Sequence, residues 1–139
     1  MKELLLPVAA FVAMIVSANS LLAETRITEI QVSPNVINLA SASTVVTVHT
    51  DLPYSSVDGE FVTLNTPNET VCIDWWKQDD RGNFVAKFDS DEVKALDEVK
   101  DAGEDGVYVT LTLEGKLTTG EPFVGTDEVK VISVQGKGR

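Results

Sequence analysis

The order of apolar and polar positions after residue 23 is mostly that of short β-strands. Apolar and polar residues alternate along brief runs, and clusters of Gly, Pro, Asn, Asp and Ser separate the runs. Alternation with period two is typical of strands that bury one face, and the separating residues are typical of turns. The expected strands are 26–32 (continued by 36–39), 44–50, 60–64, 70–77, 83–88, 106–117 and 122–134.

The connections between these runs predict how the strands pair. The clearest alternation lies in 106–117, and residues 118–121 (TTGE) are a turn that leads into the last strand. Residues 78–82 (QDDRG) connect two other strands and end in glycine, which is typical of a hairpin loop. Such connections are too short for parallel crossovers, so we expect antiparallel pairing. The fold class predicted is all-β, a single antiparallel β-sandwich of about seven strands.

One segment departs from the strand pattern and predicts a short helix near residues 90–100. Val93, Leu96 and either Lys100 or Val99 recur at steps of three and four residues after Asp89. Asp89 precedes Glu92 by three residues, the spacing of a capping box. Glycines and acidic residues at 101–106 end the helix. Residues 51–59, which contain Pro, Gly and Ser, are expected to form a loop.

The N-terminal segment has the pattern of an export signal. Residues 4–16 are an apolar run of the length expected for a signal-peptide core, and small residues follow it. We expect residues 1–23 to be a signal peptide cleaved between residues 18 and 23. An uncleaved membrane anchor is the alternative, because the apolar stretch approaches the ~20 residues that span a bilayer. The sandwich would then occupy 24–135 and a flexible tail 136–139, in a secreted, periplasmic or cell-surface protein.

Composition narrows the possible functions. The 139 residues include 22 acidic and 11 basic side chains, for a net charge of −11, which argues against nucleic acid as a partner. One cysteine and one histidine provide neither an internal disulfide nor a multi-histidine metal site. The sequence contains no G-x-S-x-G, H-E-x-x-H or phosphate-binding glycine loop. We therefore expect no cofactor and no catalytic residues.

Several of these features together resemble a known class of domains. A tryptophan in a central strand, a short helix before the last two strands, and about seven strands are similar to an immunoglobulin-like or fibronectin-III-like domain. The stretches ITEIQVSPNVINL and VTLTLEGKLTTGEPFVGTDEVKV resemble small immunoglobulin-like modules of secreted bacterial proteins. The resemblance implies a β-sandwich fold, and the fold alone implies no activity.

Adjacent tryptophans at 75 and 76 are the leading candidates for a binding site. Successive residues of a strand point to opposite faces. Trp75 shares its face with Val71 and Ile73, which predicts a core position, so Trp76 should point outward. An exposed indole can stack on a sugar or anchor a protein partner. Asp80 and Asn83 in the following turn could assist it. The alternative is that Trp76 covers a small cluster under a loop.

Other chemistry-bearing residues give weaker hypotheses. The turn from Asp79 to Asn83 is rich in oxygen ligands for calcium, but Arg81 in its centre opposes a cation, so we expect no metal. Cys72 is expected to be a buried thiol, and His49 an exposed or edge-strand residue. No spacing links the two as a nucleophile and its base.

Three functions remain. The first is an exported, non-catalytic module with a structural or protein-interaction role, bound to a protein partner. The second is a carbohydrate-binding module for an extracellular glycan, with Trp76, Asp80 and Asn83 as ligand-binding residues. A secreted enzyme is the third and least supported, because a sandwich of this size offers little room for a cleft.

Overall fold

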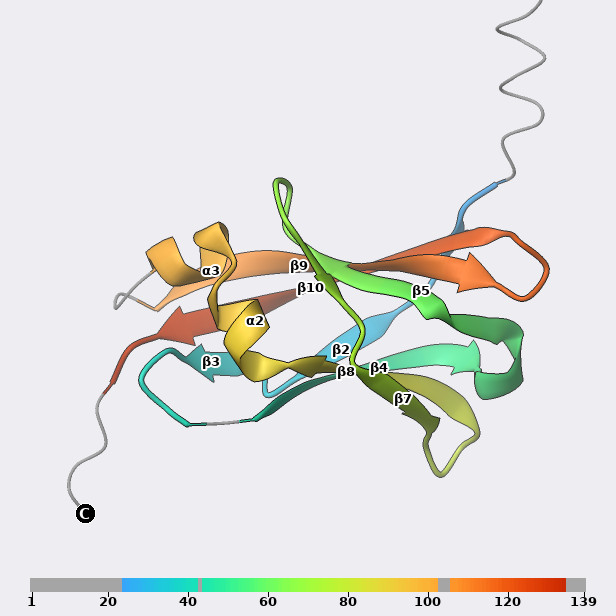
Figure 1. The fold of residues 1–139 in the computed structure, drawn as a ribbon, viewed down its shortest axis with the longest axis horizontal. Helices are drawn as coiled ribbons and strands as arrows, with labels where there is room; N and C mark the ends of the chain where they lie inside the picture. Colours follow the sequence, from blue (N-terminus) through green and yellow to red (C-terminus); the bar gives the residue numbers. More distant parts are fainter. Residues whose placement is uncertain (1–23, 43, 103–105, 135–139) are drawn as a thin grey trace, which may run out of the picture.

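The computed structural model describes residues 24–42, 44–102 and 106–134, which form two β-sheets packed face to face (Figure 1). The expected signal peptide and tail lie outside the described residues. The elements in chain order are β1 (Arg26–Ile27), β2 (Ile30–Ser33), β3 (Val36–Asn38), β4 (Val45–Pro53), the 3-10 helix η1 (Tyr54–Ser56), β5 (Val57–Asn65), β6 (Thr70–Cys72), β7 (Trp75–Gln78), β8 (Asn83–Asp89), α2 (Ser90–Lys94), α3 (Asp97–Ala102), β9 (Val107–Leu117) and β10 (Pro122–Ile132). The predicted all-β sandwich is confirmed.

Strand order distinguishes the two sheets. The six-stranded sheet has the order β1-β10-β9-β5-β6, and β3 also pairs with β10; the four-stranded sheet has the order β2-β4-β8-β7. The expectation of wholly antiparallel pairing is wrong at one edge, because β1 and β3 both pair with β10 in parallel. Parallel pairing is possible there since β10 lies at the far end of the described chain, so no tight connection joins the partners.

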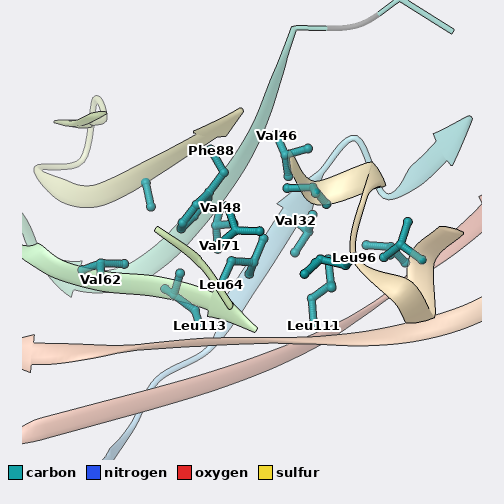
Figure 2. Packing of buried hydrophobic residues seen from close by; sticks show 14 of the residues in the cluster. Val32, Val46, Val48, Val62, Leu64, Val71, Phe88, Leu96, Leu111 and Leu113 are labelled. Atoms are coloured by element: carbon teal, nitrogen blue, oxygen red, sulfur yellow. The ribbon is translucent and has the colours of Figure 1, made fainter. Parts of the chain in front are cut away.

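The core lies between the sheets. Figure 2 shows apolar side chains from both layers meeting there, among them Leu64 and Leu113 from the six-stranded sheet and Val48 and Phe88 from the four-stranded sheet. These four side chains are fully buried. Leu96, between α2 and α3, closes the core at one end. The alternation that predicted the strands thus identifies the faces that pack together.

The predicted helix is present, but it is divided in two. Asp89 caps α2 as expected, because its Oδ1 accepts hydrogen bonds from the backbone N–H groups of Asp91 (2.8 Å) and Glu92 (3.4 Å). α2 ends at Lys94, with Ala95 as its C-cap, and α3 begins at Asp97. The buried Leu96 lies between them, so the chain turns there while this side chain stays in the core.

Further boundaries differ from the sequence prediction. The loop expected at 51–59 is limited to η1, because β4 continues to Pro53 and β5 begins at Val57. Leu52 of β4 and Val57 of β5 are buried. The strands expected at 26–32 and at 70–77 are each divided between the two sheets. The first is β1 on β10 and β2 on β4, and the second is β6 on β5 and β7 on β8. The division of 70–77 changes the candidate binding site.

Candidate binding surfaces

The two tryptophans have the opposite orientations to those predicted. Trp75 is 45% exposed, whereas Trp76 is half-buried against the core. The cause lies just before them: the N–H of Ile73 donates to Val62 of the six-stranded sheet (3.2 Å), and the N–H of Asp74 donates to Lys87 of the four-stranded sheet (2.8 Å). The two sheets face each other, so each has the core on the side toward the other. When the chain crosses from one sheet to the other, the positions that would have pointed inward point outward, and the reverse.

Trp76 fills the side of the sandwich next to β5. It pairs with Ala86, which is fully buried, so both side chains point inward. The indole lies directly over Gly59 of β5, where a β-carbon would come within 2.3 Å of the ring. The predicted outward orientation, on which the assignment of Trp76 to a ligand depended, is therefore wrong. The alternative was correct only in that the side chain is covered, because Trp76 packs against the core beside β5 and not over a small cluster under a loop.

Trp75 takes the exposed position on the outer face of the four-stranded sheet. It lies opposite Lys87 of β8, whose Nζ is 5.4 Å from the centre of the indole ring. The same Nζ donates a hydrogen bond to Oγ1 of Thr47 on β4 (3.0 Å). Burial, and secondarily the nearby Lys77, lower the pKa of Lys87. The Lys87 side chain is therefore held by two contacts, one with the Trp75 ring and one with the Thr47 hydroxyl.

Asp80 and Asn83 lie together, away from Trp76. Both line an open hollow of about 800 Å³, where they meet the side chain of His49 on β4. Trp76 is not among the residues that line it. Of the three predicted ligand-binding residues, Asp80 and Asn83 therefore lie together, whereas Trp76 packs against the core.

The hollow is acidic, and its carboxylates bind backbone groups. Its acidic residues are Glu29, Asp51, Asp79, Asp80, Asp127 and Glu128. Oδ1 of Asp79 accepts from the N–H groups of Arg81 (2.8 Å) and Asn83 (2.9 Å), closing the β7–β8 turn. The Asn83 bond above all holds the pKa of Asp79 below its usual value. Asp127 accepts from the N–H of Val32 (2.9 Å), and Asp51 accepts from the hydroxyl of Thr28.

These bonds bear on the calcium hypothesis for the Asp79–Asn83 turn. Ca²⁺ requires six to eight oxygen ligands. Oδ1 of Asp79 already serves two N–H groups of the turn. Within the described residues there is no group of three or more His, Cys, Asp or Glu side chains placed to hold a metal. The hydrogen bonds from Arg81 and Asn83 to the Asp79 carboxylate thus account for the shape of the turn without a bound ion.

The predicted positions of Cys72 and His49 also change. Cys72 is exposed rather than buried, at the end of β6 on the outer side of the six-stranded sheet. His49 lies on β4, an inner strand of the other sheet, and is half-buried between Gln31 and Val85 of the neighbouring strands. The two side chains belong to different sheets, so the core separates them.

Sequence analysis missed the outer face of the six-stranded sheet. Ile27, Phe61 and Tyr108 are 75%, 51% and 62% exposed on it. Phe61 lines a second hollow of about 460 Å³ with Val124, and Nζ of Lys116 lies 5.2 Å from the centre of its ring. Alternation in β9 does place Tyr108 on the outside. Phe61 was hidden because the register of β5 shifts between Asp58 and Thr63.

No known protein family, curated protein or solved structure matches the chain. Over the part of the chain that the structure describes, none of the helices has the length and apolar character needed to cross a membrane.

Proposed function

We propose that this chain is an exported, non-catalytic, immunoglobulin-like module that binds a protein partner. Strand order supports the immunoglobulin-like class. The order β2-β4-β8-β7 corresponds to the A-B-E-D sheet of such domains, and β5-β9-β10 corresponds to C-F-G. β6 occupies the position of the additional strand C′ beside β5. Export is supported by the apolar segment and small residues before residue 24.

The observation that carries the binding function is the exposed apolar side chains at the two ends of the outer face of the six-stranded sheet, with threonines and charged residues between them. Ile27 and Val124 lie opposite each other at one end, next to the hollow lined by Phe61. Tyr108 lies at the other end of β9, opposite Lys130 of β10. Exposed aromatic and aliphatic side chains with a polar surround are typical of protein interfaces.

A non-catalytic role is supported by the chemistry of the acidic hollow. Paired carboxylates act in catalysis when one donates and one accepts a proton at the substrate. Here Asp79 and Asp127 accept hydrogen bonds from backbone N–H groups, and Asp51 accepts one from Thr28. These bonds give the carboxylates a structural role. A glycan is the second candidate ligand, and the exposure of Trp75 favours it.

Site-specific crosslinking in the producing cell tests the protein-binding face. A photoreactive amino acid replaces Phe61 or Tyr108, and the same substitution at Thr119, exposed in the β9–β10 turn, is the control. We expect both face positions to crosslink to one common protein and Thr119 to give no such product. Absence of a product, or the same product from Thr119, would overturn the proposal.

A further inference from the structure

The outer face of the four-stranded sheet carries a row of side chains that the protein-binding proposal does not use. Strand register places Trp75, Lys87, Thr47 and Ser33 opposite one another across β7, β8, β4 and β2. Side chains paired in this way point to the same face. The adjacent row on the same face is Lys77, Val85, His49 and Gln31, of which Val85 is buried. We name these eight residues the Trp75 platform.

The platform is cationic within a strongly acidic protein. It carries two lysines, Lys77 and Lys87, and no carboxylate, although the net charge of the chain is −11. In the described part of the chain, the one ion pair joins Lys100 to Asp97 (3.5 Å), so neither platform lysine has a carboxylate partner. Burial and the neighbouring ammonium of Lys77 lower the pKa of Lys87, which an anion at this position would reverse.

The geometry of the platform suits an extended ligand. Four strands at ~4.8 Å spacing place Trp75 and Ser33 ~14 Å apart across a sheet surface. Lys77 and Lys87 are diagonal neighbours on adjacent strands, with backbones ~7–8 Å apart. A hollow of about 310 Å³ lies along this face beside Trp75, which does not line it; Lys77 and Lys87 line it, with Asp79 and Asp80 at the end near the β7–β8 turn. These two carboxylates confine an anion to the lysine end.

We propose that the Trp75 platform binds a carboxylated polysaccharide. The part of the Trp75 indole that Lys87 leaves exposed stacks on the apolar face of one sugar ring, and the ammonium groups of Lys77 and of Lys87, the latter beside the indole, pair with the carboxylates of uronic acid residues. Thr47, Ser33 and other polar side chains of the rows are placed for the sugar hydroxyls. A carbohydrate fits better than an acidic peptide, because the flat indole and the hydroxyl-bearing row match a ring that has both an apolar face and polar edges.

This inference deepens the second candidate function and does not depend on the protein-binding face. The two can fail separately, because the platform and Phe61 lie on the outer faces of different sheets. Replacing Trp75 should leave the crosslinks formed from Phe61 and Tyr108 unchanged.

Titration of the full-length protein tests the platform. The probe is polygalacturonate, with dextran as the neutral polymer and polyglutamate as the acidic non-sugar polymer; binding is followed by calorimetry and tryptophan fluorescence. We expect saturable binding of polygalacturonate alone. Trp75→Ala and Lys87→Gln should each lower the affinity at least about tenfold. Added salt should weaken the wild-type complex, since its lysines pair with carboxylates.

Lys116→Gln is the matched control. Lys116 also lies over an aromatic ring, that of Phe61, but on the other sheet, so its loss should change affinity by less than about twofold. All variants should keep the wild-type melting temperature within a few degrees, since the replaced side chains are at the surface. No binding of polygalacturonate, equal binding of dextran or polyglutamate, or an equal loss in Lys116→Gln would overturn the proposal.

Discussion

Replacing Gly59 by alanine should destabilise the sandwich, because the added methyl group has no room beneath the indole of Trp76. A β-carbon at residue 59 would come within 2.3 Å of Cε2, 2.6 Å of Cδ2 and 2.8 Å of Cζ2 of that ring. Ordinary carbon contacts are ~3.5–4.0 Å, so the ring or the strand must move by about 1 Å. Overpacking of this kind lowers the free energy of unfolding by about 1–3 kcal/mol. Alanine also restricts the unfolded chain more than glycine does, which offsets ~0.4–1 kcal/mol of that loss.

We therefore expect Gly59→Ala to lower the free energy of unfolding by about 1–2 kcal/mol and the melting temperature by about 3–10 °C. Urea denaturation of the full-length protein, followed by circular dichroism, measures the first quantity without relying on tryptophan emission. Replacing the large ring should remove the conflict: in a Trp76→Leu background, Gly59→Ala should be neutral or slightly stabilising.

Gly115 provides the control for this cycle. Its β-carbon would come within 2.7 Å of Phe123 and 3.0 Å of Val62, neither of which Trp76→Leu alters. Gly115→Ala should be equally harmful in both backgrounds. If Gly59→Ala costs as much with leucine at position 76 as with tryptophan, the contact between the indole and β5 is not what requires glycine.

Three further substitutions test local features. Asp89→Ala should cost about 1 kcal/mol of unfolding free energy by removing the cap of α2, measured by urea denaturation. Asp79 has a lowered pKa, chiefly through the N–H of Asn83, so it stabilises the fold above its unfolded pKa of 3.8 and loses that effect as pH falls through the folded value. Asp79→Ala should thus be less stable than wild type at pH 7, and in an acid denaturation series the difference should shrink as the pH falls below about 4 and disappear once the pH is below the lowered pKa of the folded state. Lys77→Gln should raise the pKa of Lys87 by removing a like charge, which an NMR titration of the lysine side chains reports.

Local signals in the sequence predicted what local interactions determine. The Asp89 cap, the hairpin turn ending at Gly82 and the alternation of β9 each depend on residues a few positions apart, and all three are present. The glycine of the β7–β8 turn has a positive φ of 85°, as its position requires. The neighbouring Asp80 and Asn83 were placed together for the same reason.

Non-local features could not be read in the same way. The passage between sheets at Ile73–Asp74 has no Pro or Gly to mark it, because both residues keep hydrogen bonds to a sheet. Two alternating segments therefore appeared as one strand, and Trp75 and Trp76 were assigned to the wrong faces. The acidic hollow likewise joins Asp51, Asp80 and Asp127 from distant parts of the chain, and only the folded topology brings them together.

The lengths of the strands have a consequence for how the protein behaves at high concentration. The strands at the edges of both sheets are two to four residues long, whereas the inner strands β4, β5, β8 and β9 have seven to eleven. β10 is also long, but β1 and β3 cover its two ends, and Asp127 on its middle stretch is bonded to the N–H of Val32. Short edges offer few free N–H and C=O groups to a strand of another molecule. The fold thus resists edge-to-edge growth into fibres, and the long strands become available for such growth only when the sandwich opens.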